Sequence, residues 1–155
     1  MAGTIEARLA ELGIRLPQAA APAANYVPWT VTGNLVFVAG QITLADGALK
    51  HQGKLGADIT LEEGYAAARL CGLNVIAQLK AACGGDLDRV VRIVRLGGFV
   101  NASGDFHDHP KVINGASDLM VEVFGDKGHH ARAAVGCASL PLNVATEVEA
   151  VAEIT

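Results

Sequence analysis

The sequence predicts an α+β fold in which a mixed β-sheet carries two long helices packed on one face. Residues 60–83 and 110–124 repeat apolar side chains with the period of a helix. Segments rich in β-branched residues alternate with them, which gives the order α–β–β–α–β–α–β–β. The last segment, residues 144–154, alternates strictly, as expected of a strand with one face on the core. We expect one domain over residues 1–155, with residues 1–25 as an N-terminal helix and arm.

Two of the predicted helices carry recognisable start signals. Residues 4–13 form a short helix in which Thr4 can act as the N-cap. In the long helix of residues 60–83, Thr60 and Glu63 have the spacing of a capping box, in which hydroxyl and carboxylate satisfy free backbone amides reciprocally.

The first two strands are predicted around a glycine-asparagine turn. An Ala/Pro-rich arm, residues 18–25, precedes strands at residues 26–32 and 35–39. Gly40 follows at once, and a residue without a side chain allows a neighbour or a ligand to approach the backbone closely. Residues 89–101 are β-branched and predict a central strand.

The end of the chain predicts a β-hairpin formed by residues 131–137 and 144–154. With a turn at Leu140-Pro141, Arg132 would lie opposite Glu149 and diagonal to Glu147 on one face of the sheet. A slip of one residue would move Glu147 to the other face, and the sequence does not decide between these registers.

Composition limits the class of protein and of partner. The chain has 155 residues, of which 51% are hydrophobic and 18% charged, so part of the apolar surface is expected between subunits of a homo-oligomer. A net charge of −4 without a basic cluster argues against nucleic-acid binding. No apolar run is long enough to span a membrane, no leader is evident, and the three cysteines form no CxxC pair, so a cytoplasmic protein with free thiols is expected.

Several kinds of chemistry find no support in the sequence. His107 and His109 could chelate a metal in an extended segment, but no third ligand stands at a zinc-like distance, and we favour solvated loop histidines. No GxSxG, Walker or GxGxxG motif is present, and no thiol has a neighbouring base. Covalent catalysis and nucleotide-phosphate binding therefore find no support.

Arg132 is the residue with the strongest indication of function. A guanidinium is a planar, permanent cation that matches a carboxylate, and small neighbours such as Ala134 leave room for the body of a small anion. His130 shares its strand face and could line the same pocket. Glu147 could orient or deprotonate a water molecule. The structural alternative is a cross-strand ion pair of modest stabilising value.

The segment ARAAVGCASLPLNVATEVEAVA closely resembles the C-terminal signature of the Rid (reactive intermediate deaminase) family, also called the YjgF or L-PSP endoribonuclease family. Upstream elements of the family follow in order from Tyr26 onward, so the resemblance covers most of the chain. It implies a chorismate-mutase-like fold and a homotrimer with three clefts at subunit interfaces.

The resemblance also implies a reaction, the hydrolysis of small 2-imino or enamine acids to 2-keto acids and ammonia. This reaction needs neither metal nor organic cofactor, because the substrate is already an activated imine. Arg132 would then bind the substrate carboxylate and Glu147 would position water. Tyr26 would form a cleft wall, Asn114 a polar neighbour, and Gly40 an open floor.

This chain departs from the deaminase pattern at three positions where many members carry polar side chains, namely Ala39, Ala134 and Gly136. One alternative is therefore a trimer that binds small carboxylates without turnover. A further alternative is an L-PSP-type endoribonuclease, against which the negative charge weighs.

Overall fold

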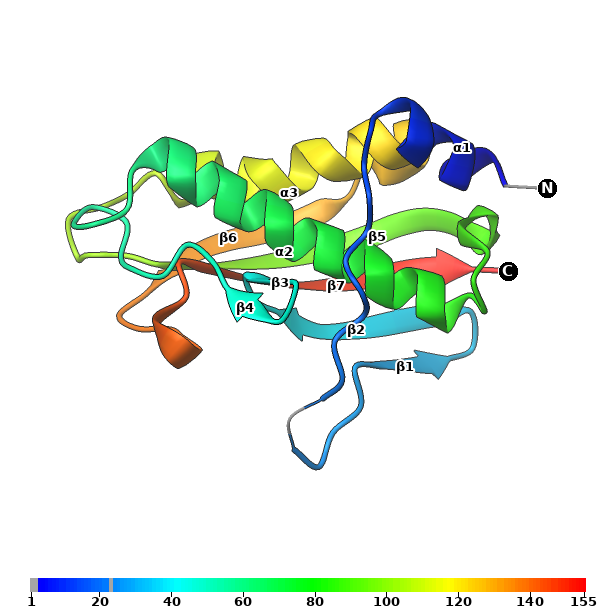
Figure 1. The fold of residues 1–155 in the computed structure, drawn as a ribbon, viewed down its shortest axis with the longest axis horizontal. Helices are drawn as coiled ribbons and strands as arrows, with labels where there is room; N and C mark the ends of the chain where they lie inside the picture. Colours follow the sequence, from blue (N-terminus) through cyan, green and yellow to red (C-terminus); the bar gives the residue numbers. More distant parts are fainter. Residues whose placement is uncertain (1–2, 23) are drawn as a thin grey trace.

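The computed structural model describes residues 3–22 and 24–155 and consists of a five-stranded sheet with two long helices on one face (Figure 1). The strand order is β1-β2-β7-β5-β6, and β3 and β4 form a separate two-stranded ribbon. The α+β class, the mixed sheet and the placement of both helices are confirmed. The elements are α1 (Thr4–Glu11), β1 (Trp29–Thr32), β2 (Leu35–Gln41), β3 (Leu44–Ala45), β4 (Ala48–Leu49), α2 (Leu61–Ala82), β5 (Val90–Asn101), α3 (His109–Phe124), β6 (Ala131–Cys137) and β7 (Thr146–Ile154), with short 3₁₀ helices at Leu87–Arg89, Gly125–Gly128 and Pro141–Asn143.

Both long helices begin where the sequence predicts. The Thr60 hydroxyl accepts a hydrogen bond from the backbone N–H of Glu63, and the Glu63 carboxylate accepts one from the Thr60 N–H, so the predicted capping box starts α2. In α3, Pro110 occupies the first turn, where its missing N–H costs no helical hydrogen bond. α2 packs over β7 and β2, and α3 packs over β5 and β6.

The predicted C-terminal hairpin is wrong. β6 pairs with β5 in parallel, and β7 pairs antiparallel with both β5 and β2, so that β5 separates β6 from β7. The cause is α3, which follows β5 and returns the chain to the same end of the sheet, as a parallel crossover requires. Arg132 consequently pairs with Leu96 of β5 and with no residue of β7.

The two faces of the sheet differ in composition and in cover. Along β7, alternate residues from Thr146 to Ile154 are buried under the helices, while Glu147, Glu149, Val151 and Glu153 are half-buried on the uncovered face. This alternation confirms the pattern predicted for the last strand. The uncovered face also carries Phe37 of β2 and Val135 of β6, which are 42% and 47% exposed.

Strand β1 starts three residues later than predicted, at Trp29. Pro28 lacks the N–H that a ladder position uses, so residues 26–28 lie outside the sheet. The register of β2 against β7 shifts between Val38 and Gln41, which places a bulge at Ala39 and Gly40.

The first helix is anchored by a residue 84 positions further along the chain. Gly3 occupies the N-cap position without a side-chain hydrogen bond, so the predicted Thr4 cap is wrong. Instead, the Asp88 carboxylate accepts hydrogen bonds from the backbone N–H groups of Thr4 and Ile5, at 2.8 and 2.9 Å. These two donors, that of Ile5 first, hold the pKa of the Asp88 carboxyl below its ordinary value.

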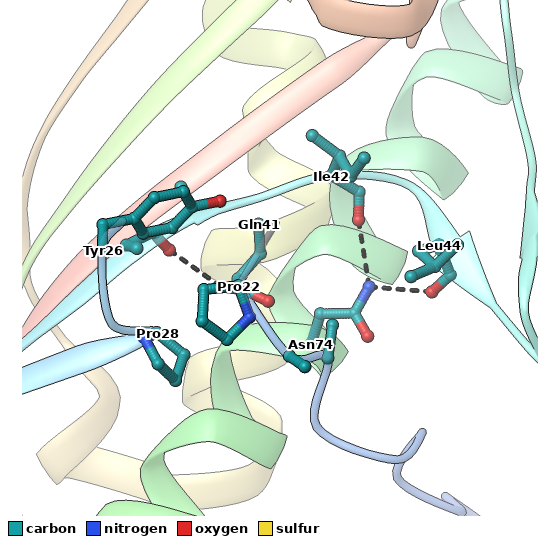
Figure 2. A pocket seen from close by; sticks show the side chains of 11 residues that line it. Pro22, Tyr26, Pro28, Gln41, Ile42, Leu44 and Asn74 are labelled. Atoms are coloured by element: carbon teal, nitrogen blue, oxygen red, sulfur yellow. Dashed lines mark hydrogen bonds between the residues drawn. The ribbon is translucent and has the colours of Figure 1, made fainter. Parts of the chain in front are cut away.

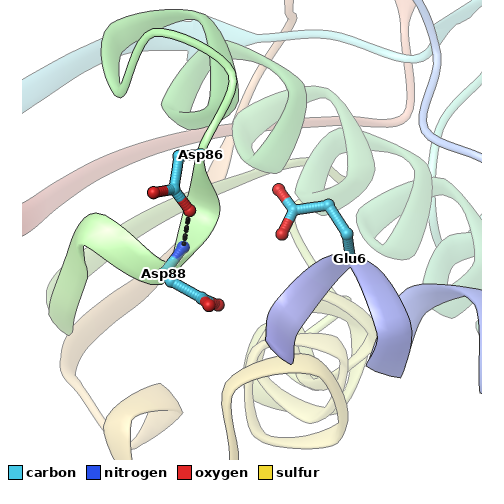
Figure 3. Close-up of side chains that lie close together, drawn as sticks. All are labelled: Glu6, Asp86 and Asp88. Atoms are coloured by element: carbon cyan, nitrogen blue, oxygen red, sulfur yellow. Dashed lines mark hydrogen bonds between the residues drawn. The ribbon is translucent and has the colours of Figure 1, made fainter. Parts of the chain in front are cut away.

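Asp88 belongs to a cluster with Glu6 and Asp86 (Figure 3). Within residues 3–22 and 24–155, it is the only group of three potential metal ligands whose ligand atoms all lie within 4.8 Å of one another. Glu6 of α1 accepts from the Leu87 N–H and so joins α1 to the 3₁₀ helix that begins at Leu87, while Asp86 accepts from the Asp88 N–H and caps that 3₁₀ helix. The hydrogen bonds indicate a structural clamp.

The cysteines of this chain are free thiols that differ in burial. Cys71 and Cys83 are buried free thiols, as predicted, whereas Cys137 is partly exposed. Burial raises the pKa of Cys71 to about 12, so this thiol stays protonated and packs as an apolar side chain of the core.

None of the helices in the described part of the chain has both the length and the hydropathy needed to cross a bilayer.

Close contacts of α3 with its neighbours depend on two glycines that flank Asn114 in space. A side chain on Gly98 of β5 would lie 2.6 Å from Ile113, and one on Gly115 would overlap the backbone oxygen of Tyr65 in α2. Ile113 thus occupies the space that the missing side chain of Gly98 leaves. The bulges of β5 lie nearer its start, before Arg95.

We predict that Gly115→Ala lowers the free energy of unfolding by at least about 1 kcal/mol, because overpacking against a backbone atom outweighs the improved helix propensity. Urea denaturation followed by circular dichroism measures this. Gly104→Ala is the matched control, because the new methyl group would meet nothing within 4 Å; its expected effect is within about 0.5 kcal/mol. Equal effects of the two substitutions would contradict the prediction.

Candidate functional site

Arg132 lies in a cluster of hydrogen-bonded polar side chains on the helix-covered side of edge strand β6. Its Nη1 donates to Asn114 Oδ1 at 2.8 Å and to Ser117 Oγ at 3.1 Å, both on α3. Its Nη2 makes a longer contact, 3.4 Å, with the carbonyl oxygen of Pro110. We call Asn114, Ser117, His130 and Arg132 the arginine cluster. The structure therefore brings together three residues that the sequence singled out.

These hydrogen bonds divide the donors of the guanidinium into used and available ones. Both protons of Nη1 are committed to α3, whereas the described residues offer Nε no hydrogen-bond acceptor and offer Nη2 only the weak Pro110 contact. Nε and Nη2 form one edge of the guanidinium plane. A carboxylate can accept two parallel hydrogen bonds from that edge.

Both ring nitrogens of His130 are occupied within the protein. Nδ1 lies 2.7 Å from the Gly128 carbonyl oxygen and Nε2 lies 2.8 Å from Ser117 Oγ. Burial, and then the nearby Arg132 cation, lower the pKa of His130, although the Gly128 carbonyl opposes the shift. A neutral imidazole is therefore favoured near pH 7.

Beyond Arg132, the same side of β6 continues with small residues. Ala134 is half-buried against the core, and Gly136 lies two positions further on. A side chain at Gly136 would overlap Nε2 of His109, so the imidazole of His109 occupies the space that glycine leaves. His107 and His109 line a hollow of about 290 Å³ with Cys137.

Glu147 lies on the opposite, uncovered face of the sheet, beside the β2 bulge. A Cβ atom built on Gly40 would lie 3.0 Å from the Glu147 carboxyl group, so the glycine makes room for this side chain. Burial, and then the Glu149 carboxylate, raise the pKa of Glu147 above its ordinary value. The carboxyl therefore takes up protons more readily than an exposed glutamate.

Tyr26 lies at the other side of the bulge, where the N-terminal arm passes the end of β2. It lines a pocket of about 180 Å³ with Pro22, Pro28 and Gly40 (Figure 2). Asn74 of α2 supports this pocket, since its amide donates to the carbonyl oxygens of Ile42 and Leu44. Tyr26 is 53% exposed, so its ring is available to a second molecule. We call Tyr26, Gly40 and Glu147 the bulge group.

Of the two arrangements that the sequence left open, the one with Arg132 and Glu147 on the same face of the sheet does not occur. Arg132 pairs with the buried Leu96, whereas Glu147 pairs with Phe99, whose side chain lies on the other face. The intervening β5 adds two strand spacings, about 10 Å, to this difference. Within one chain the arginine cluster and the bulge group are therefore two separate half-sites.

Sequence reasoning missed two supporting polar residues. Ser117 follows Asn114 at the i, i+3 spacing that puts two side chains on one helix face, and this spacing could have identified it. Asn74 stands in an otherwise apolar stretch of α2, and a buried amide in such a helix indicates a specific partner.

The chain resembles proteins of known sequence or structure. The family model described as "YjgF/chorismate mutase-like, putative endoribonuclease" matches residues 6–154. Protein TCP17 of Trypanosoma cruzi is 50% identical over 98% of this chain and 95% of its own length. A crystallised protein of Shewanella oneidensis, called a "putative endoribonuclease", is 45% identical, with a TM-score of 0.94, over 98% of this chain and all of that one.

A more distant solved structure is Escherichia coli TdcF with bound serine, which is 25% identical with a TM-score of 0.60, over 91% of this chain and 94% of that one. The family model covers nearly the whole chain, and the fold agrees with that of the solved relatives. The chain therefore belongs to the YjgF/chorismate mutase-like family.

Proposed function

We propose that this protein hydrolyses small 2-imino or enamine carboxylic acids to 2-keto acids and ammonia, in a cleft assembled between chains of a homotrimer. The observation that carries the proposal is the orientation of Arg132. Asn114 and Ser117 bind its Nη1 and leave the Nε and Nη2 edge for a substrate carboxylate. The serine bound to Escherichia coli TdcF supports a small amino-acid-derived ligand for the family fold.

The chemistry matches the groups present. Water adds to the carbon of the protonated C=N bond while a carboxylate accepts one of its protons, and collapse of the resulting carbinolamine expels ammonia and leaves the C=O bond of the keto acid. We assign the proton transfers to Glu147, whose raised pKa favours exchange nearer neutral pH. The imine is already activated, so the proposed reaction uses no metal or organic cofactor.

The separation of the half-sites supports a cleft between two chains. β6 is an edge strand, so the arginine cluster can meet a neighbouring molecule, and the uncovered sheet face with Phe37 and Val135 offers apolar surface for association. We propose that each cleft joins the arginine cluster of one chain to the bulge group of the next. Tyr26 would then form a wall of the cleft, Gly40 would form its floor, and Ala134 would leave space for the body of the ligand.

We further propose that residues 1–155 form one domain and that the reaction takes place in the cytoplasm.

A second candidate is binding of small carboxylates without turnover. The small residues Ala39, Ala134 and Gly136 favour it, because they offer no polar side chain to a reacting group. Calorimetry that gives saturable binding of pyruvate by a protein without imine hydrolysis would establish this alternative.

We predict that Arg132→Ala lowers kcat/KM for 2-iminopropanoate about 10- to 100-fold, the loss expected for a charge-assisted pair. The imine is generated from alanine by an amino-acid oxidase, and pyruvate formation is followed against a buffer blank. Arg95→Ala is the control, because Arg95 is an exposed arginine of the neighbouring strand. Turnover that equals the buffer rate in the wild type, or that Arg132→Ala leaves unchanged, would refute the assignment.

We predict that Glu147→Gln lowers kcat by about 10²- to 10⁴-fold and changes pyruvate affinity little. In the wild type, kcat/KM should fall as pH drops through the pKa of Glu147, because protonation removes the base. That acid limb should lie above the ordinary glutamate value of about 4.3. Glu149→Gln should move it to lower pH by removing one of the two causes of the shift. An acid limb unaffected by Glu149→Gln would count against Glu147 as the base.

Mixing two impaired variants tests the cleft between chains directly. Arg132→Ala and Glu147→Gln chains, unfolded together and refolded in equal amounts, should recover about one quarter of wild-type activity, since an intact cleft needs a normal half-site from each of two neighbours. Each variant refolded alone should keep only its own lowered activity, at most about one tenth of wild type for Arg132→Ala. No recovery in a verified mixed oligomer would place the whole site in one chain.

A further inference from the structure

A chain of hydrogen bonds runs behind Arg132, away from the side on which a ligand would bind. Ser117 Oγ lies 3.1 Å from Arg132 Nη1 and 2.8 Å from His130 Nε2. The other ring nitrogen of His130 lies 2.7 Å from the Gly128 carbonyl oxygen. Gly128 ends the 3₁₀ helix before β6, and Ser117 belongs to α3, so the chain connects both elements to the guanidinium.

The direction of each hydrogen bond follows from the first one. A carbonyl oxygen can only accept, so His130 Nδ1 carries the proton and donates to Gly128. Nε2 of the neutral ring is then an acceptor, and the Ser117 hydroxyl donates to it. This leaves the Ser117 oxygen lone pairs for the Nη1 proton of Arg132. All three bonds run in the same direction, which strengthens each of them.

We propose that Ser117 and His130 are positioning residues for the carboxylate-binding guanidinium of Arg132, a role that rests on the function proposed above. Ser117 and Asn114 together occupy both protons of Nη1, which fixes the plane of the guanidinium and presents Nε and Nη2 to the ligand. His130 keeps the Ser117 hydroxyl turned so that its oxygen can accept from Arg132. His130 thereby acts on the ligand through two intermediate side chains.

The charged surroundings of His130 decide which state of its ring is stable. On its own segment, His129 and Arg132 are its neighbours, and both disfavour the imidazolium. From α3, Asp118 and Glu122 line a hollow of about 490 Å³ together with His130. In the 3₁₀ helix before His130, Asp126 and Lys127 are exposed.

The two carboxylates of α3 already have partners of their own. Tyr65 donates to Asp118 at 2.7 Å, and Arg69 forms an ion pair with Glu122 at 3.2 Å. Neither carboxylate is hydrogen-bonded to His130 in the described structure, so burial remains the dominant influence on the ring.

Protonation of His130 would reverse one bond of the chain. Nε2 would become a donor, and the Ser117 oxygen would face two cationic donors, the imidazolium and Nη1. The guanidinium would lose its fixed orientation, so carboxylate affinity should fall as pH drops. A purely electrostatic role predicts the opposite sign, because an additional positive charge attracts an anion more strongly.

The first measurement reads the ring directly. The nitrogen chemical shifts of His130 should identify the Nδ1–H tautomer at pH 7.5 in the complete protein. An Nε2–H tautomer would overturn the proposal, whatever the protein binds.

The second measurement uses pyruvate as the probe in calorimetry at pH 7.5 and pH 5.5. We predict that Ser117→Ala weakens binding about tenfold at pH 7.5, the loss of one hydrogen bond to a charged group, and that Ser117→Thr restores it. Wild-type affinity should fall severalfold at pH 5.5, and Ser117→Ala should lose this dependence. His129→Ala, at the adjacent exposed histidine, should bind pyruvate as wild type does at pH 7.5. Tighter binding at pH 5.5, or an unchanged Ser117→Ala affinity, would overturn the proposal.

Failure of the proposed function is distinguishable from failure of this inference. If wild-type protein binds no pyruvate, the mobility of the Arg132 guanidinium still reports the positioning role. Faster rotation about its Cζ–Nε bond in Ser117→Ala, measured by nitrogen relaxation, would support the positioning role without the ligand. Unchanged rotation would refute it.

Discussion

The close packing of α3 determines where the side chains of the arginine cluster lie. Ile113 occupies the space above Gly98 of β5, and Gly115 lets α3 approach the α2 backbone at Tyr65. Asn114 lies between these two contacts, and Ser117 lies one helical turn further on. Both glycines thus fix the height and rotation of α3 above β6, and with them the acceptors that orient Arg132. A change in this packing would displace the acceptors without altering any polar residue.

The position of β5 between β6 and β7 has an equally direct effect on the candidate site. It puts the arginine cluster and the bulge group on opposite faces of one sheet, too far apart to contact the same small molecule within one chain. The proposed cleft between two chains follows from this separation. The small residues of β6 and the glycine of the β2 bulge allow two backbones to approach each other there.

Local patterns predicted the elements of this fold better than their order in the sheet. The 3.6-residue period, the Thr60–Glu63 capping box and the alternation of β7 depend on neighbours in sequence, and all were predicted correctly. The pairing of β6 depends on where α3 returns the chain, which no local pattern records. The cap of α1 was missed for the same reason, since Asp88 is distant in sequence.

The candidate site was predicted in its parts but not in its assembly. Arg132, Asn114 and His130 do lie together, and Gly40 does make room for Glu147. Ser117, which joins Arg132 to His130, had no motif of its own. Arg132 was found from its charge and its small neighbours, and Asn114 from the family resemblance. Only its spacing of one helical turn from Asn114 could have indicated Ser117, and its contact with His130 required coordinates.

The anchoring of α1 by Asp88 has a consequence for the order in which the protein folds. An isolated helix of eight residues is not stable in water, and the N-terminal amides of α1 find their acceptor only after α2 and the following 3₁₀ helix are in place. This segment, which is synthesised before α2, is therefore among the last to become ordered. Until then, the apolar side chains of Ile5 and Leu9 remain exposed to other nascent chains and to chaperones.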